Sequence, residues 1–402
     1  MTATVDSPAT TIGEARRWAI LGASTLAQAA AAVTIHGPAF LIPALHDREG
    51  LSLAAAGLVA AAPTIGVMLT QVAWGAFVDR RGERLTLLLG LGSTAVAGLL
   101  AALLGTGAGV AVLGAVLLLA GAAAASTGAA SGRVVVGWFP PHRRGVAMGI
   151  RQMAQPVGVG IAAISIAVTA AEAGLRAALL IPLGAAVLAG LLVAVVILDP
   201  PRGVVTAHEA RNPYRDDAYL ARIHAVSVLL VVPQFLVWTF ALVWLVQDRD
   251  WSPGAAGLLV AIAQVAGALG RIGAGALSDV VASRLRPLRW VAIAAGATMA
   301  ALGLATGADL GIAVALVVLA TVLTVADNGL AFTAVAERAG PAWSGRAMGV
   351  QNTAQYLAAS LVPPIAGWSV THGGYALTFG AAALFPLLAI GLVPVRDEAP
   401  LT

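Results

Sequence analysis

The stretch that decides the fold is GAFVDRRGERL at residues 75–85, which returns 200 residues later as GALSDVVASRL at residues 275–285. Two further blocks keep the same offset. Their matched pairs are Ser52 and Ser252, Ala56 and Ala256, Gly57 and Gly257, Leu58 and Leu258, Ala147 and Ala347, Met148 and Met348, Gly149 and Gly349, Ala154 and Ala354, and Gln155 and Gln355. One register over three blocks indicates two equivalent halves. Paired halves in a membrane protein place a binding site at their interface, so the repeat suggests a transporter.

The composition agrees with a membrane protein. The 402 residues are 59% hydrophobic and only 10% charged, far from the range of soluble domains. Crossing the hydrocarbon core takes about 20 residues of helix. Twelve apolar stretches satisfy this length: 17–45, 53–78, 85–105, 108–137, 145–171, 174–198, 221–246, 254–278, 289–307, 309–335, 345–371 and 374–395. They lack the alternation of barrel strands, so helices are predicted.

The predicted fold is an all-α integral membrane protein with twelve transmembrane helices in two pseudo-symmetric halves of six. Its expected parts are a cytoplasmic tail (1–16), an N-terminal half (17–198), a cytoplasmic linker (199–220), a C-terminal half (221–395) and a second cytoplasmic tail (396–402).

The basic residues predict the orientation. All of them are Arg, and with both termini inside the cell only Arg48, Arg176 and Arg249 fall on the outer side. Positive residues collect in cytoplasmic loops, so both termini are expected in the cytoplasm and the protein in the cell membrane. This topology also explains the basic charge balance, and no groove-reading helix or aromatic-basic platform points to nucleic acid.

Several classes of chemistry find no support in the sequence. The chain has no Cys, which removes disulfides and thiolate sites. Its six His residues are scattered, with no carboxylate at metal-ligand spacing. No loop has room for a soluble catalytic domain. We therefore expect no enzyme activity, no cofactor and no metal, and a monomer in contact with lipid.

The loop between the second and third spans carries the most specific motif. Its residues resemble the G-x-x-x-D-[RK]-x-G-[RK]-[RK] signature of the major facilitator superfamily, and they are Gly75, Asp79, Arg80, Gly82 and Arg84. The resemblance implies a twelve-helix secondary transporter in which this motif gates alternating access and does not bind substrate. The second half keeps only part of the motif, Gly275, Asp279 and Arg284, with Val280 and Ala282 in place of the basic residue and the glycine.

Arg271 is the first candidate for substrate binding. It lies eight residues before Asp279, about 12 Å deeper along the helix, and a charge at that depth needs an anion, a carboxylate or a water-filled cavity. Its context, RIGAGALSD, resembles that of anion-carrying branches of the superfamily, which implies that Arg271 grips an anionic substrate. The alternative is an internal pairing with Asp327 or with helix-end carbonyls. Its repeat equivalent, Gln71, is a candidate for an amide contact to the same ligand or for a bridge between helices.

Asp327 is the carboxylate placed well within a predicted span. It follows Thr321 and Thr324 at intervals of three on one helix face. A buried carboxylate near Arg can take up and release a proton, which predicts proton coupling, with a structural ion pair as the alternative. His36, ahead of a Gly-Pro pair, is a second proton-handling candidate or a simple hydrogen-bonding group.

Polar stripes on the fifth and eleventh spans complete the candidate site. They are expected to line opposite walls of one cavity and comprise Arg151, Gln155, Gln351, Asn352, Gln355 and Tyr356, with Gln234 and Trp238 added from the seventh span. Arg133, near the cytoplasmic end of the fourth span, is expected to pair with a loop acid or to reach the membrane surface.

Three functional interpretations remain. The favoured one is a proton-coupled secondary transporter of a small organic anion. The second is a proton-driven exporter of drugs or lipophilic metabolites, although the helix-four and helix-five motifs typical of that branch are missing. The third is a non-transporting membrane receptor, which predicts no flux.

Overall fold

The computed structural model describes residues 12–105, 107–201 and 211–399, and every regular element among them is helical. The chain folds into two compact units. Unit 1 contains Met1–Pro140, Met153–Arg211 and Ala339–Thr353, and unit 2 contains Pro141–Gln152, Asn212–Arg338 and Ala354–Thr402. Each unit therefore takes in one short segment from the other half of the sequence.

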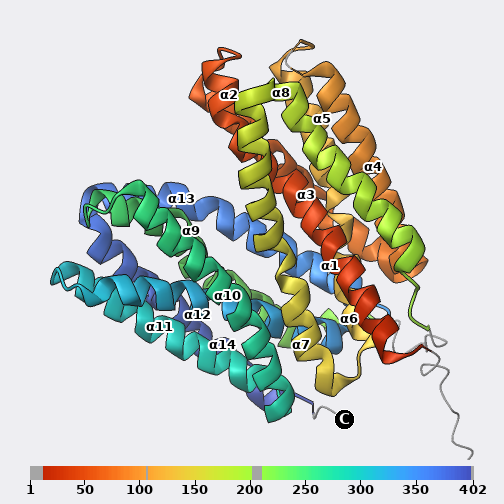
Figure 1. The fold of residues 1–402 in the computed structure, drawn as a ribbon. Coiled ribbons are helices and arrows are strands. Elements are labelled where there is room, and N and C mark those ends of the chain that lie inside the picture. Colours follow the sequence, from red (N-terminus) through yellow and green to blue (C-terminus); the bar gives the residue numbers. More distant parts are fainter. Residues whose placement is uncertain (1–11, 106, 202–210, 400–402) are drawn as a thin grey trace, which may run out of the picture. The chain divides into compact units, whose positions relative to one another are not determined.

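Unit 1 is built from six apolar helical segments of the first half of the sequence, of which α1, α4 and α8 pack together and α3 packs on α5 (Figure 1). Its elements are α1 (Glu14–His36), η2 (Gly37–Leu41), α2 (Ile42–Asp47), α3 (Leu53–Arg81), α4 (Glu83–Leu104), α5 (Val110–Ala124), α6 (Ser126–Trp138) and α8 (Ala154–Val196). The start of α13 (Ser344–Ala382) joins them.

Unit 2 holds the remaining helices, with α9 and α11 packed on α14 and α10 packed on α7. Its elements are α7 (Pro141–Gln152), η3 (Pro213–Arg215), α9 (Tyr219–Gln247), α10 (Pro253–Val281), α11 (Leu285–Gly307), α12 (Ile312–Ala339), the rest of α13, α14 (Leu384–Leu392) and η4 (Val395–Asp397).

The membrane-spanning segments confirm the predicted fold class. The described residues contain 10 stretches long and apolar enough to cross a membrane, and two of these, Pro141–Val196 and Ser344–Asp397, are 56 and 54 residues long. Each of the two is divided by a glycine with positive φ, Gly174 at 85° and Gly374 at 75°. Because L side chains rarely adopt such a φ, these glycines turn the chain back, and the segments supply twelve spans.

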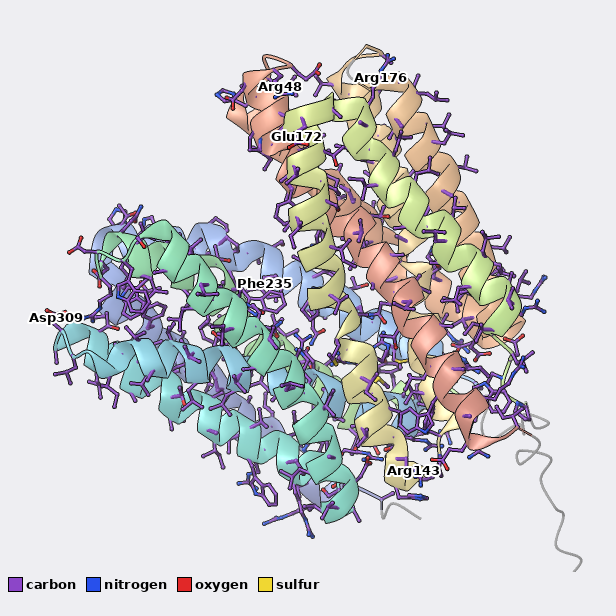
Figure 2. The ribbon with its side chains drawn as sticks, in the orientation of Figure 1. Arg48, Arg143, Glu172, Arg176, Phe235 and Asp309 are labelled. Carbon is purple, nitrogen blue, oxygen red and sulfur yellow. The ribbon has the colours of Figure 1, made fainter. Side chains whose placement is uncertain are left out.

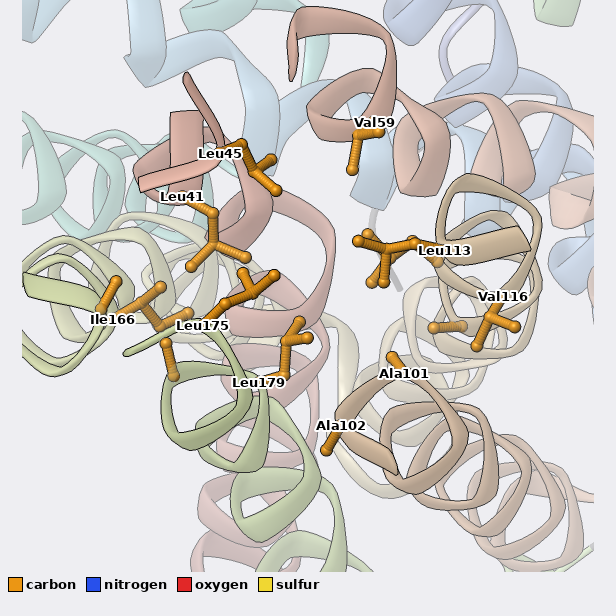
Figure 3. Packing of buried hydrophobic residues seen from close by; sticks show 14 of the residues in the cluster. Leu41, Leu45, Val59, Ala101, Ala102, Leu113, Val116, Ile166, Leu175 and Leu179 are labelled. Carbon is orange, nitrogen blue, oxygen red and sulfur yellow. The ribbon is translucent and has the colours of Figure 1, made fainter. Parts of the chain in front are cut away.

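Small residues let the helices approach closely. The buried cluster of unit 1 joins Leu41, Leu45 and Val59 with alanines such as Ala101 and Ala102 (Figure 3). Unit 2 has a corresponding apolar cluster that contains Trp244 and Phe379, whose rings meet edge to face at 5.9 Å. In lipid, where apolar burial between helices gains little, such close packing supplies much of the cohesion.

The repeat extends to the ends of helices. Ser52 accepts a hydrogen bond from the backbone N–H of Ala55 at 3.2 Å, and Ser252 accepts one from Ala255 at 3.3 Å. Both serines cap the helix that carries the 75–85 or 275–285 string. The duplicated serines therefore mark the same helix start in each half.

One end of unit 1 gathers two of the arginines that are predicted on the outer side. Arg48, Glu172 and Arg176 lie at the end away from the start of α1 (Figure 2), and Arg48 donates hydrogen bonds to the carbonyls of Ala170 and Ala171. The predicted outer arginines Arg48 and Arg176 thus share one end. Residues 1–11, 202–210 and 400–402, which belong to the predicted tails and linker, lie outside the described residues.

Candidate functional site

Asp79 of the loop motif binds the start of a helix from the other half of the sequence. Its side chain is 1% exposed, and it accepts hydrogen bonds from the backbone N–H groups of Gly345 at 2.8 Å and Arg346 at 3.0 Å, in the first turn of α13. The Arg346 Nε donates a third at 3.1 Å. A carboxylate at a helix N-terminus is stabilised both by the free N–H groups and by the helix dipole.

Arg133 completes this arrangement in unit 1. Its Nη1 donates to Asp79 at 2.8 Å and to the carbonyl of Pro341 at 2.5 Å, and its Nε donates to Glu83 at 2.7 Å. The Glu83 side chain is fully buried. The prediction that Arg133 pairs with a loop acid is confirmed, and Glu83, which the sequence analysis passed over, is one of its partners.

Unit 2 repeats the arrangement around Asp279. This carboxylate accepts hydrogen bonds from the N–H groups of Gly145 at 3.0 Å and Val146 at 2.9 Å, near the start of α7. Arg284 binds it at 2.5 Å and also donates to the carbonyl of Pro141. We call Asp79 and Asp279 the helix-end carboxylates.

Glu337 adds a second acid to the Asp279 site. It contacts both Arg284, at 3.3 Å, and Arg144, at 3.3 Å. Burial alone would lower the pKa of the Arg284 guanidinium, but the charges of Glu337 and Asp279 hold that pKa above its usual value. Arg284 therefore stays charged at any physiological pH.

Glycines bring the backbones together at both helix-end carboxylates. A Cβ on Gly75 would lie 2.3 Å from the carbonyl oxygen of Gly345, and a Cβ on Gly275 would lie 2.1 Å from that of Gly145. No side chain larger than hydrogen fits at such distances. The two motif glycines are thus needed for the contacts that Asp79 and Asp279 make.

The other motif residues serve the turn. Gly82 has φ +100° between α3 and α4, and Asp199 accepts a hydrogen bond from the N–H of Arg84 at 2.7 Å. The Arg84 guanidinium donates to the carbonyl of Ala194 at 2.7 Å, whereas Arg80 is exposed. In unit 2 the tail residue Glu398 caps α11 in the same way, through the N–H groups of Arg284 and Leu285.

The interior of unit 2 collects most of the charged candidates. Arg271, 3% exposed, donates from Nη1 to the carbonyl of Gln152 at 2.7 Å and from Nε to that of Val325 at 3.4 Å. Its guanidinium carbon lies 6.0 Å from the centre of the Trp238 ring. The carbonyl of Gln152, at the end of α7, matches one of the predicted alternatives, whereas Val325 lies within α12. Among the described residues, Nη2 has no hydrogen-bond partner.

Asp327 lies within electrostatic reach of Arg271 but does not bond it. The residue is 1% exposed, and neither carboxylate oxygen has a hydrogen-bond partner among the described residues. A charged carboxylate that is buried without a hydrogen-bond partner costs free energy.

Arg151 is a second buried cation in unit 2. It is 1% exposed, its guanidinium carbon lies 5.4 Å from the centre of the Phe332 ring, and its Nη1 donates to the Gln152 side-chain oxygen at 2.8 Å. Gln152 thus offers one oxygen to each arginine. The partly buried Tyr356 lies close enough to Arg151 for an electrostatic interaction between the two side chains.

An amide chain crosses unit 2 from α9 to α13. Asn328 donates to Gln234 at 3.0 Å and accepts from Gln355 at 3.3 Å. Trp238, one turn after Gln234, packs against Phe235 with ring centres 5.4 Å apart (Phe235 is labelled on α9 in Figure 2). The Trp238 Nε1 is buried and has no hydrogen-bond partner among the described residues. The structure places Gln234, Trp238, Arg271, Asp327 and Gln355 in one unit.

The remaining predicted site residues belong to unit 1. Gln71 is 4% exposed and Gln351 is fully buried, and Gln71 and Asn352 each leave one buried amide atom, Oε1 and Nδ2, without a hydrogen-bond partner among the described residues. His36 is the last residue of α1, and its Nε2 is also buried without a hydrogen-bond partner among the described residues. Gln155 and its repeat equivalent Gln355 fall in different units.

These observations define a class: a helical membrane protein of two repeated units whose spans bury charged and amide side chains. The comparisons name the family. The chain matches the Major Facilitator Superfamily over residues 22–363, and it is 43% identical over 391 residues to an uncharacterised MFS-type transporter, Rv2994, of Mycobacterium tuberculosis (strain ATCC 25618 / H37Rv), a match that covers 96% of this chain and 87% of the relative. The chain belongs to the major facilitator superfamily and is a secondary transporter, not an enzyme.

Solved structures show the same fold at low sequence identity. The outward conformation of the transporter FucP superposes with a TM-score of 0.77 at 13% identity, covering 94% of this chain and 99% of that one. The proton:xylose symporter XylE gives 0.73 at 16%, covering 97% and 98%. The human organic anion transporter MFSD10 gives 0.70 at 16%, covering 94% and 99%. At these identities the likeness extends to the fold alone.

Proposed function

We propose that this transporter moves a small organic anion and couples the movement to protons, with Arg271 as the anchor for the anion. The observation that carries the proposal is the charge of the unit 2 interior. Arg271 and Arg151 are almost fully buried there, and Asp327 is the buried carboxylate beside them. An anionic cargo would compensate the positive charge of Arg271, which its carbonyl partners do not neutralise.

The contacts of Arg271 support this role. Its hydrogen bonds go to neutral carbonyl oxygens, which orient the guanidinium but do not neutralise its charge. Nη2 makes no hydrogen bond to any described residue and can donate to a carboxylate. Charge-assisted bonds of this kind are about twice as strong as neutral ones. The fixed guanidinium is therefore preorganised for a monoanion.

Asp327 supplies the proton step of the proposal. The carboxylate oxygens of Asp327 have no hydrogen-bond partner among the described residues, and the carboxylate lies within the electrostatic field of Arg271. An anion bound to Arg271 would weaken that field and promote proton uptake by Asp327. Binding of substrate and proton would then assist each other. His36 stays a second candidate, on the strength of its unbonded Nε2.

The helix-end carboxylates are proposed to gate the cycle. Each holds a helix from the other half of the sequence through backbone N–H groups and arginine side chains. Such contacts can be broken and remade as a set, because they involve no covalent change and little apolar area. Following the arginine distribution, we place both termini in the cytoplasm. We also place the protein in the bacterial inner membrane, with a monomer as the functional unit.

One observation favours a second candidate, a proton-driven exporter of lipophilic compounds. The Phe235–Trp238 pair offers an aromatic surface beside Arg271, and the carbonyl contacts of Arg271 also suit a purely structural arginine. In that case the anchor would be the aromatic pair, and the arginine would support α7.

Uptake into proteoliposomes with an imposed pH gradient separates the two. Labelled small carboxylates are expected to enter with wild type, and Arg271→Gln is expected to reduce their uptake about tenfold to a hundredfold, the worth of one charged hydrogen bond. Arg289→Gln, at an exposed arginine of α11, is the matched control and should behave like wild type. Carboxylate uptake that survives Arg271→Gln contradicts the anchor. Flux of lipophilic cations alone supports the exporter, and no flux of any kind supports a receptor.

A further inference from the structure

Gln152 contacts both buried arginines of the unit 2 interior. It is the last residue of α7, and its backbone carbonyl accepts a hydrogen bond from the Arg271 Nη1 at 2.7 Å. Its side-chain oxygen accepts one from the Arg151 Nη1 at 2.8 Å. All three residues belong to unit 2. One residue thus links the proposed anchor to a second guanidinium.

The carbonyl of Gln152 is open to Arg271 because of the residue four positions later. In a continuous helix this carbonyl would accept a hydrogen bond from the N–H of residue 156. Residue 156 is proline, which has no N–H, and a turn at Met153 separates α7 from α8. The C-terminal end of α7 also carries a partial negative charge, which attracts a guanidinium.

The contact with Gln152 is the shorter of the two hydrogen bonds that orient Arg271. The Nη1 lies 2.7 Å from the Gln152 oxygen, whereas the Nε lies 3.4 Å from the oxygen of Val325. A guanidinium is planar and rigid, so a restraint on Nη1 also sets the direction of Nη2. Gln152 therefore has the larger part in aiming the nitrogen that is proposed to bind the anion.

Arg151 in turn restrains Gln152. Arg151 is 1% exposed, and its guanidinium carbon lies 5.4 Å from the centre of the Phe332 ring on α12. Side chains of adjacent residues do not face each other within a regular helix, and this bond between neighbours forms at the end of α7. A series of contacts thus runs from Phe332 through Arg151 and Gln152 to Arg271.

The equivalent positions of unit 1 carry different residues. Gln152 and Arg271 correspond to Asn352 and Gln71, and the residue four positions after Asn352 is Tyr356, which keeps its N–H. The helix α13 accordingly runs through position 352 without a break. The repeated helix framework therefore does not require the arrangement around Gln152.

We propose that Gln152 is the positioning residue of the anion site, and that Arg151 holds Gln152 in place instead of binding the substrate. The inference rests on the proposed function, since it describes how Arg271 is aimed at the same anion. With Nη1 already held, the Arg271 side chain does not have to be ordered when the anion binds. Ordering one long side chain on binding weakens affinity by about twofold to tenfold.

The test measures binding and transport separately. Lactate, succinate and benzoate are titrated calorimetrically into the purified full-length protein in detergent, and uptake of the tightest binder is followed in proteoliposomes. Gln152→Met keeps the length of the side chain but removes the acceptor for Arg151. It is expected to raise the Kd and the KM about twofold to tenfold and to leave the maximal rate unchanged, because Gln152 acts on binding.

Gln247→Met is the matched control. Gln247 is the last residue of α9, and its side-chain oxygen accepts a hydrogen bond from Tyr375 at 3.3 Å. This variant also removes an acceptor at a helix end of unit 2, and its Kd should equal that of wild type. Melting temperatures of all variants check that each is folded.

A double-mutant cycle separates positioning from direct binding by Arg151. Arg151→Met should weaken carboxylate binding by the same factor as Gln152→Met. The double variant should bind no more weakly than either single variant, because all three break the same link to Arg271.

The outcomes separate this inference from the proposed function. A Kd of Gln152→Met that equals wild type, even with a lower melting temperature, overturns the positioning role and leaves the Arg271 anchor standing. Losses that multiply in the double variant also overturn it, because Arg151 then acts on the anion independently of Gln152. A wild type that binds none of the three carboxylates contradicts the proposed function and this inference together.

Discussion

The two units of this transporter treat their interiors differently although their sequences repeat. Unit 2 buries Arg271 and Asp327, whereas the equivalent positions in unit 1 are Gln71 and Thr127, both neutral. The same helix framework thus carries charge in one unit and uncharged hydrogen-bonding groups in the other. The repeat therefore specifies the packing of the helices, and substitutions at single positions give the two units different chemistry.

The helix-end carboxylates show a second kind of difference. Asp79 is bound by Arg133 of α6, whereas Asp279 is bound by Arg284 in the turn before α11. The repeat equivalent of Arg284 is Arg84, which bonds the carbonyl of Ala194 instead. Both Arg133 and Arg284 nevertheless reach equivalent proline carbonyls, those of Pro341 and Pro141. The position of the guanidinium is repeated, but the residue that supplies it is not.

The largest expected effect concerns the charged interior of unit 2, where one substitution should abolish the pH dependence of uptake. Asp327→Asn should abolish the pH dependence of uptake, since the only buried acid proposed to carry the proton is lost, while exchange of internal for external substrate continues. Thr127→Val, at the equivalent position of unit 1, should leave the pH dependence unchanged. The measurement is uptake into proteoliposomes between pH 5 and 8. A normal pH profile in Asp327→Asn would show that Asp327 does not carry the coupled proton.

The carboxylate comparison predicts large losses of stability at non-equivalent arginines. Arg133→Leu and Arg284→Leu should each cost about 3–5 kcal/mol, because Arg133 binds the buried carboxylates of Glu83 and Asp79, and Arg284 binds that of Asp279. Arg84→Leu should cost under about 1 kcal/mol, since the Arg84 side chain is exposed and donates to one carbonyl. Thermal unfolding in detergent gives the ranking. A large loss for Arg84→Leu together with a small one for Arg133→Leu would show that the repeat equivalents, not the observed contacts, carry the stability.

A smaller effect is expected at the glycine contacts. Gly275→Ala should cost about 1–3 kcal/mol by forcing α10 and α7 apart, because the new methyl would lie 2.1 Å from the carbonyl oxygen of Gly145. Gly273→Ala, two residues earlier on the same helix, meets nothing within 4 Å and should be neutral or slightly stabilising. The same thermal assay compares the two variants. Equal melting temperatures would show that the close contact at Gly275 does not contribute to stability.

Most of the helix framework was accessible from the sequence. Long apolar stretches predicted the spans, and the turns at Gly174 and Gly374 fall in or next to the predicted gaps between spans. The duplicated motif predicted the importance of Asp79 and Asp279. These features depend on hydrophobic length and on local turn chemistry, both of which a single sequence displays.

The partners across long sequence distances were not accessible. No local pattern shows that Asp79 binds the N–H groups of Gly345 and Arg346, or that residues 141–152 pack in unit 2.

The most direct test of the central claim, that unit 2 binds an anion through Arg271, is a thermal-shift titration of wild type and Arg271→Gln with a panel of carboxylates, inorganic anions and lipophilic cations. A ligand that binds the folded protein raises its melting temperature. At least one carboxylate is expected to stabilise wild type and to lose this effect in Arg271→Gln. Equal stabilisation of both proteins, or stabilisation by lipophilic cations alone, would contradict it.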